Sequence, residues 1–181
     1  GEQLEVRLFN ETSRLDLNAA TREQLATLIE LAQGEEGNEE GQRDQLADAI
    51  IDWRDPDDLT QLNGAEDGDY EASGLPYGAR DEPFRSVEEL RNVLGMTLTL
   101  YQRLAPDLTV ANPSGSVELQ FASAAVLAAV QGIALEDAQL AVDDRNQPLF
   151  PDGDSLPPLN RGGPLYRLRI GLVRGEAVQR T

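Results

Sequence analysis

The acidic residues of this chain are densest at positions 52–69, where seven carboxylates stand in eighteen residues beside a single arginine. Oxygen-rich loops suit hard cations, because Ca²⁺ takes roughly six to eight oxygen ligands at about 2.3–2.6 Å. The spacing Asp55-x-Asp57, with Glu66 at the twelfth position, is reminiscent of an EF-hand but does not match one. Its glycine, Gly64, is tenth instead of sixth, and a proline is second. The pattern indicates calcium chemistry without a known loop geometry.

Two interpretations of this acidic segment stay open on the residues alone. Seven carboxylates repel one another, and a loop that contains glycine loses much conformational entropy when it is ordered. A divalent ion would offset the repulsion and hold the segment in one shape, with Ca²⁺ favoured over Mg²⁺ because no substrate phosphate is implied. The alternative is a solvated, mobile surface loop that only confers solubility.

Composition argues against several classes of enzyme. The chain has no histidine and no cysteine, so a Ser-His-Asp or Cys-His nucleophile and a thiolate metal site are excluded within it. Paired carboxylates could in principle hydrolyse glycans, but aromatic residues, which stack on sugars, make up only 5% of the chain. The net charge of −18 opposes phosphate backbones and favours cations or basic partner surfaces. We therefore expect a non-enzymatic protein that does not bind nucleic acid.

The elements predicted around the acidic segment are strands at the two ends of the chain and short helices between them, which is an α+β pattern. Alternating apolar and polar residues predict strands at Leu4–Phe9 and Tyr166–Val173, and a short strand is expected at residues 108–110. Residues 55–84 show little periodicity and are predicted as a long loop that something must hold. Helices are expected after Thr21, from about Arg43 to before Pro56, after Ser86, around Leu100–Leu104, after Ser123, and over Leu135–Val142. Further loops are expected at Gly34–Gly41 and around Asp152–Asp154, the latter a plain turn or a second ion site.

A weak internal repeat aligns residues 117–131 with residues 15–29 and places Thr21 and Ser123 at equivalent helix caps. Two glycine-centred helical pairs, at Gly95 and Gly132, resemble helix-hairpin-helix turns that hold DNA phosphates. The second glycine of that motif is absent from both pairs, and few basic residues surround them. We expect packing modules at these positions, and a DNA-binding role is the weaker alternative.

The acidic segment and several later elements together resemble minor pseudopilin K of the type II secretion system. The acidic run has the family's D-W-x-D-x-D-D stretch followed by G-A-E, although Asp69 replaces the first of its two tyrosines and Tyr70 keeps the second. The family's second N-x-N-T element is degraded at residues 118–122. Further matching elements lie, in order, at residues 15–19, 76–77, 83–91, 95–97 and 101–110.

This resemblance implies a pilin-like core, here a small antiparallel sheet, with a large helical insertion of modules similar to sterile-alpha-motif domains. The implied parts are residues 1–15 and 146–181 for the core, 16–106 for a first helical module with the acidic loop, and 107–145 for a second. It also implies that an N-terminal hydrophobic helix with a prepilin cleavage site is missing from this chain. The full-length protein would be periplasmic, anchored in the inner membrane only through that helix, and then part of the pseudopilus.

The function implied by the resemblance is that of a cap at the pseudopilus tip, in complex with minor pseudopilins of the I and J types. Contact with secreted proteins is a further expectation. Calcium is bound in the family through the acidic loop, and the residues of this chain that match it are Asp55, Asp57, Asp58, Glu66, Asp67 and Asp69. The main alternative is a calcium-stabilised protein-binding module of another secretion or adhesion apparatus.

Overall fold

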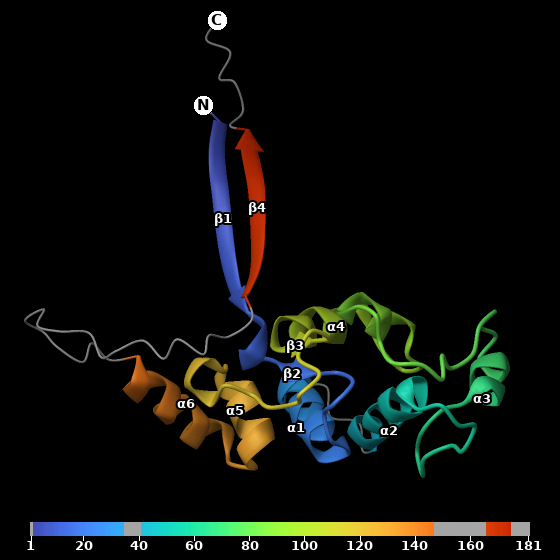
Figure 1. Ribbon diagram of the computed structural model, residues 1–181. Coiled ribbons are helices and arrows are strands. Elements are labelled where there is room, and N and C mark those ends of the chain that lie inside the picture. Colours follow the sequence, from blue (N-terminus) through green and yellow to red (C-terminus); the bar gives the residue numbers. More distant parts are fainter. Residues whose placement is uncertain (1, 35–40, 147–165, 175–181) are drawn as a thin grey trace, which may run out of the picture.

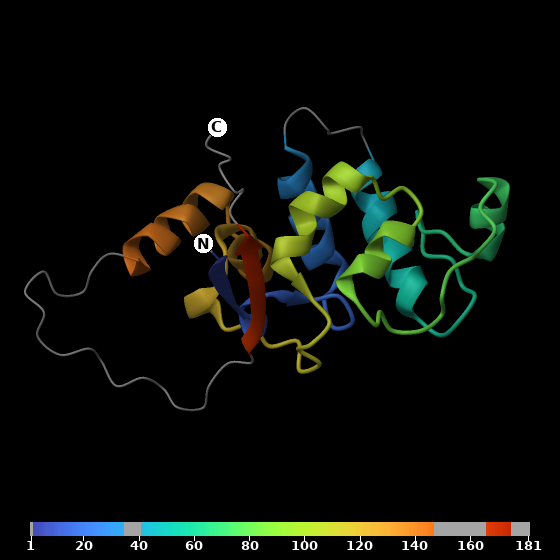
Figure 2. The ribbon, with the colours of Figure 1, turned by 90° about the horizontal axis from the view of Figure 1, so that it is seen from above.

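The computed structural model describes residues 2–34, 41–146 and 166–174. Two parts are visible in Figure 1: a body of short helices, and a two-stranded ribbon that projects away from it. Seen from above in Figure 2, the body is elongated, with α3 at one end and α6 at the other. The predicted loop residues 35–40 and the predicted turn at 152–154 lie outside the described residues.

The ribbon consists of β1 (Glu2–Asn10) and β4 (Tyr166–Arg174), which pair antiparallel over their whole length. Both strands were predicted from period-two alternation and the small antiparallel sheet was implied by the family resemblance, and the structure confirms them. Val6 lies opposite Ile170, so these residues share one face with Leu168, and each of the three is more than half exposed. An isolated two-stranded sheet is marginally stable in water, so this apolar face is suited to being covered.

The first half of the body is built around α1 (Arg22–Gln33) and α2 (Gln42–Arg54), which pack against each other. The predicted cap Thr21 begins α1: its side chain accepts the Gln24 backbone N–H, and the Gln24 side chain accepts the Thr21 backbone N–H in return. Leu25, Leu28 and Ile29 of α1 are buried in the main core, as their helical spacing predicted. The core also takes in Leu46, Ile50 and Trp53 of α2.

Two predictions between α2 and the middle of the chain were wrong in detail. The long segment expected to be loop contains α3 (Asp67–Ala72), because Glu66 and Asp69 form a carboxylate version of the capping box. The helix expected after Ser86 is the 3₁₀ helix η3 (Val87–Asn92), and the Ser86 side chain makes no capping hydrogen bond. Its side chains Val87 and Leu90 are nevertheless buried.

The second half of the body repeats the capping pattern of the first. After α4 (Leu98–Leu104) and η4 (Ala105–Asp107), the chain forms η5 (Leu119–Phe121), α5 (Ala124–Gln131) and α6 (Leu135–Arg145). The Ser123 hydroxyl accepts the Val126 N–H at 3.1 Å and begins α5, as Thr21 begins α1, which supports the internal repeat. Gly132, at φ 66°, ends α5 where the sequence predicted a break.

A short parallel pairing that the sequence did not predict joins β2 (Leu15–Asp16) to β3 (Leu108–Thr109). The buried Asp16 carboxylate accepts the N–H of Asn18 at 2.8 Å and of Asn112 at 2.7 Å. The start of the helical body is thereby tied to the segment that leads into its second half. Among the helices of the described ranges, none has the length and apolar character needed to cross a membrane.

Candidate metal centre

The C-terminal half of α2 is the platform on which the acidic loop is held. Asp52 is fully buried, and its carboxylate accepts the backbone N–H of Ala65 at 2.8 Å and of Gln61 at 3.1 Å. One turn earlier, Asp48 accepts the backbone N–H of Asn63 at 3.2 Å and its side-chain amide at 3.0 Å. Two carboxylates on one helical face therefore fix the backbone of residues 61–65 through hydrogen bonds to charged acceptors, which are stronger than neutral ones.

The guanidinium of the single arginine of the segment hydrogen-bonds outside the loop, although its charge opposes the rise that burial causes in the pKa of Asp55. Arg54 donates its guanidinium N–H groups to the carbonyl oxygens of Leu17 and Ala20, the latter at 2.7 Å. Burial lowers the pKa of this guanidinium. A second arginine near the loop, Arg80, is ion-paired with Glu82 at 3.1 Å and with Glu89. The carboxylates of the loop are therefore left with little compensating positive charge.

Three carboxylates near the loop each have one oxygen that is buried and has no hydrogen-bond partner: Oδ1 of Asp55, Oε1 of Glu66 and Oδ1 of Asp81. Buried polar atoms are nearly always hydrogen-bonded, and an unpaired one calls for an explanation such as a bound ion. Glu66 is only 8% exposed, so solvent does not serve its buried oxygen. Oxygen atoms of this kind are the ligands that a hard cation takes.

Electrostatic repulsion shows which acidic residues lie close together. Burial, followed by the charges of Asp52, Asp81, Asp55 and Asp58, raises the pKa of Glu66 to about 7. Burial and the neighbouring charges of Asp57 and Asp81 raise the pKa of Asp55. For Asp81, burial and the charges of Asp67 and Asp58 raise the pKa. A cation placed among these groups would relieve both the desolvation and the mutual repulsion.

The structure places the six candidate ligands in different roles. Asp55 and Glu66 carry unpaired buried oxygens, while Asp57, Asp58 and Asp67 are exposed and act on the other carboxylates through their charge. Asp57 also accepts the N–H of Leu59 at 2.9 Å. The sixth, Asp69, accepts the Glu66 backbone N–H at 3.0 Å as part of the α3 cap.

Asp81 is the member of this group that sequence reasoning missed. It lies beyond α3, outside the dense acidic run, and it is the only non-glycine residue with positive φ among the described residues, at 55°. Aspartate tolerates this left-handed backbone better than most residues. The signal available in the sequence was one acidic residue near the end of a loop that something had to hold.

An aromatic cluster lies beneath the acidic loop and links it to the core. Trp53 packs against Tyr70 and Phe84, with ring centroids 5.9 Å and 6.2 Å apart. The Tyr70 ring is fully buried, its hydroxyl accepts the Leu94 N–H at 3.0 Å, and burial raises its pKa to about 12. Because Trp53 follows Asp52 directly, its environment should respond to changes in the loop.

In the part of the chain that the structure describes, no three acidic side chains stand close enough together to form a metal-binding group as they are placed. The donor set nevertheless fits a hard divalent cation by its chemistry: buried unpaired oxygens, several carboxylates, and arginines engaged elsewhere. Backbone carbonyls and water commonly supply ligands beside carboxylates in calcium sites.

The raised carboxylate pKa values predict a pH dependence for the metal-free protein. Glu66, with a pKa of about 7, and Asp52, whose pKa burial raises to about 6, bind protons more tightly in the folded state than in the unfolded chain. Stability contributed by their protonated forms is therefore complete below about pH 4 and is lost as pH rises through 6 and 7. We expect urea unfolding of chelated protein to show about 1–3 kcal/mol less stability at pH 8 than at pH 5. Glu66→Gln should remove most of this difference, and equal stabilities at the two pH values would contradict it.

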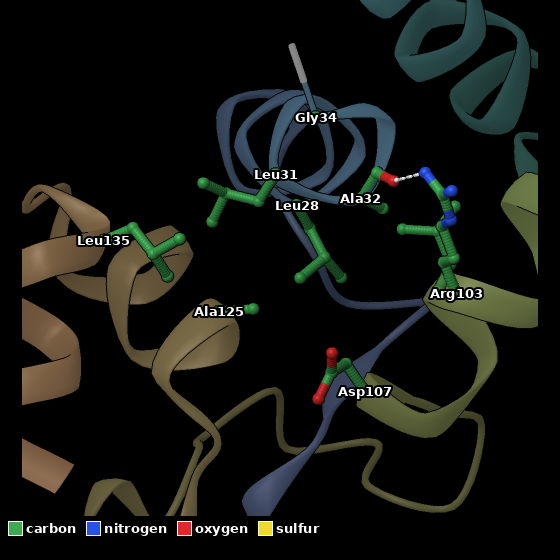
Figure 3. A pocket seen from close by; sticks show the side chains of 9 residues that line it. Leu28, Leu31, Ala32, Gly34, Arg103, Asp107, Ala125 and Leu135 are labelled. Carbon is green, nitrogen blue, oxygen red and sulfur yellow. Dashed lines mark hydrogen bonds between the residues drawn. The ribbon is translucent and has the colours of Figure 1, made fainter. Parts of the chain in front are cut away.

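A second feature of the body is a hollow of about 380 Å³ between α1, α4 and α5, distant in the chain from the acidic loop (Figure 3). Its walls include Leu28, Leu31 and Ala125. Arg103 at its edge donates to the Ala32 carbonyl at 3.0 Å, which satisfies the C-terminal end of α1. Burial raises the pKa of Asp107, the acidic residue of the hollow. The hydrogen bond from Arg103 therefore joins the C-terminal end of α1 to α4.

The fold and site together define a mixed α and β protein in which a helical body stands on a strand ribbon and carries an acidic loop suited to a cation. A family model described as "Type II secretion system (T2SS), protein K" matches residues 6–114, which is more than half of the chain. The chain therefore belongs to the protein K family of the type II secretion system, as its motifs predicted.

Individual relatives agree with this assignment. Type II secretion system protein K of Pseudomonas aeruginosa is 30% identical over 171 residues, which cover 85% of this chain and 48% of the relative. The protein of the same name from Aeromonas hydrophila is 36% identical over 111 residues, 57% of this chain and 33% of the relative. That of Klebsiella pneumoniae is 47% identical over 62 residues, 34% of this chain and 19% of the relative. The chain thus spans about half or less of the length of these relatives.

A solved structure shares the fold. A chain of the GspK-GspI-GspJ complex from the type 2 secretion system of enterotoxigenic Escherichia coli matches with a TM-score of 0.63 and 22% identity. The match covers 97% of this chain and 71% of that chain. Ribbon and helical body therefore belong to one architecture that recurs in a secretion protein.

Proposed function

We propose that this chain is the periplasmic part of a minor pseudopilin that caps the tip of the type II secretion pseudopilus. The observation that carries the proposal is the match of residues 6–114 to the protein K family. The fold likeness to a chain from a complex of three pseudopilus proteins supports it. In this role the protein acts through its shape and surface, without catalysis and without binding nucleic acid, and its partners are minor pseudopilins of the I and J types. Secreted proteins are a further class of partner.

The shape of the molecule suits a cap. In the proposal, residues 1–15 and 146–181 contribute to a pilin-like core, and the exposed apolar face with Val6, Leu168 and Ile170 packs on a hydrophobic N-terminal helix of the full-length protein. That helix would anchor the protein in the inner membrane before assembly. The helical modules at 16–106 and 107–145, proposed to be similar to sterile-alpha-motif domains, form a body much wider than the ribbon (Figure 1). A body of this width would block the addition of further subunits above it.

We further propose that the acidic loop holds a structural Ca²⁺. The residues that would hold it are Asp55, Glu66 and Asp81, whose buried oxygens lack partners, together with Asp57, Asp58 and Asp67 nearby. Asp69 stays a candidate from the sequence, although its carboxylate caps α3. The ion would supply positive charge and nothing catalytic. Through their shared contact with the ion, these side chains would hold residues 55–81 against α2, so that this end of the body keeps one shape.

Formation of a ternary complex tests the proposed role directly. We expect the chain, mixed with the periplasmic parts of I-type and J-type minor pseudopilins from the same secretion system, to elute as one species with the mass of a 1:1:1 complex. Size-exclusion chromatography with light scattering measures this mass. I-type and J-type proteins that associate with each other but exclude this chain would contradict the role and favour a binding module of another apparatus.

A further inference from the structure

The ribbon and the body meet at a joint built around one buried carboxylate, Glu11. The chain leaves β1 at Asn10 and enters the 3₁₀ helix η1 (Glu11–Ser13) at the root of the ribbon. Glu11 is 2% exposed although it is charged and lies at the edge of the body. Such a residue is almost never fully buried unless it is paired.

The partners of Glu11 come from both sides of the joint. From the ribbon, the Arg167 guanidinium of β4 places Nε 3.0 Å from Oε1 in an ion pair and donates Nη2–H to Oε2 at 3.2 Å. From the body, the Thr109 hydroxyl of β3 donates to Oε2 in a buried hydrogen bond. Arg14, just after η1, lies 3.8 Å from Oε1. One carboxylate therefore joins three segments that are far apart in the sequence.

The backbone around Glu11 is held as well. The Asn10 side chain accepts the N–H of Thr12 at 3.0 Å and its hydroxyl at 2.8 Å, which caps η1. The carbonyl of Thr12 accepts the Glu118 N–H at 2.8 Å from the segment before η5. The turn from ribbon to body is therefore held by the side chain of Asn10 and by a backbone hydrogen bond from a neighbouring segment.

We propose that Glu11 is the positioning residue of a rigid joint that sets the direction of the β1–β4 ribbon relative to the helical body. If the turn after β1 were the only connection, the ribbon of β1 and β4 could change its direction relative to the body. One hydrogen bond to Oε2 and one ion-pair contact at Oε1, an atom that accepts no hydrogen bond, join Arg167 to Glu11 and restrict that freedom, because a planar guanidinium facing a carboxylate limits orientation as well as distance. Loss of Arg167 would leave the buried Glu11 carboxylate with the more distant Arg14 as the remaining basic partner that the described residues show.

The consequence for the pseudopilus depends on the proposed function. If the ribbon belongs to the part that packs into the pseudopilus, the joint decides where the body stands over the tip. The joint itself is a property of this chain and can be tested without any partner, so a failed ternary complex and a flexible joint are separate results.

The test measures the distance between ribbon and body by double electron–electron resonance. Because the chain has no cysteine, Glu5→Cys in β1 and Gln102→Cys in α4 place spin labels at these two positions alone. We expect one narrow distance distribution in the parent. Glu11→Gln and Arg167→Gln should each broaden it at least about twofold, because both remove the charge-assisted two-point contact.

Arg85→Gln is the matched control, since Arg85 forms an exposed ion pair with Glu82 at 2.8 Å and is not among the partners of Glu11, and it should leave the distribution unchanged. A Glu11→Gln distribution as narrow as that of the parent would overturn the proposal. If circular dichroism shows that Glu11→Gln does not fold, Arg167→Gln decides, because the Arg167 side chain is 43% exposed and lies outside the core. A narrow distribution in that variant would then overturn the proposal.

Discussion

Calcium at about a hundredfold excess over its Kd is expected to raise the free energy of unfolding by about 2.7 kcal/mol relative to chelated protein. For a chain of this size the gain corresponds to a rise in Tm of roughly 5–10 °C. The physical reason is that Asp55, Glu66 and Asp81 hold buried oxygens without partners, and burial and mutual repulsion oppose their ionisation. Thermal unfolding in EDTA and in millimolar CaCl₂, followed by the fluorescence of the single tryptophan, Trp53, measures the effect.

Two glutamate variants sharpen this measurement. Glu66→Gln removes the ligand charge and should raise the Tm of the chelated protein while most of the response to calcium is lost. Glu71→Gln changes an exposed acidic residue of α3 and should respond to calcium as the parent does. An unchanged Tm in all three proteins on adding calcium would show that the acidic loop keeps its shape without an ion.

Gly64→Ala is expected to lower the free energy of unfolding by about 1–3 kcal/mol, the usual effect of forcing an extra carbon into a packed site. A Cβ at position 64 would overlap the carboxylate of Asp52, which is fully buried and cannot move aside easily. The clash would also disturb the hydrogen bonds from Ala65 and Gln61 to Asp52, which hold the loop on α2. Urea unfolding at pH 7 gives the difference in free energy.

Gly68→Ala provides the comparison that isolates this clash. Gly68 lies in α3, a Cβ there meets no atom within 4 Å, and its backbone does not need positive φ. Alanine reduces the freedom of the unfolded chain and should stabilise the protein by about 0.4–1 kcal/mol. Equal destabilisation by the two substitutions would mean that loss of glycine itself, and not contact with Asp52, weakens the loop.

The sequence by itself determined the local elements and the family. Thr21 and Ser123 begin α1 and α5 as predicted, because a cap needs only a hydroxyl and the backbone N–H three residues later. Alternation likewise predicted β1 and β4, since the period of a strand lies within the strand itself. The density of carboxylates at 52–69 led to the prediction of a cation site, which stays a prediction, whereas the ordered motifs indicated the protein K family, which the family model confirms.

Roles within the acidic loop were decided only by the tertiary structure. The sequence offered six carboxylates as candidate ligands, but folding makes Asp69 a helix cap, makes the seventh carboxylate, Asp52, a backbone anchor, and adds Asp81 from a later segment. Arg54, the one base in the run, hydrogen-bonds the carbonyls of Leu17 and Ala20 and acts on Asp55 through its charge. Which donors a side chain reaches depends on how distant segments pack.

Long-range pairing explains the rest of what the sequence left open. The parallel contact of β2 with β3 and the contact of Glu11 with Arg167 join residues that are far apart in the chain. The short strand at 108–110 was predicted, but its two-residue partner β2 and the lone Glu11 have no period to detect, and their stability comes from partners that loop closure must first bring together. Local propensity therefore determined the elements of this protein, and only the folded arrangement decided which charged groups are buried and which are paired.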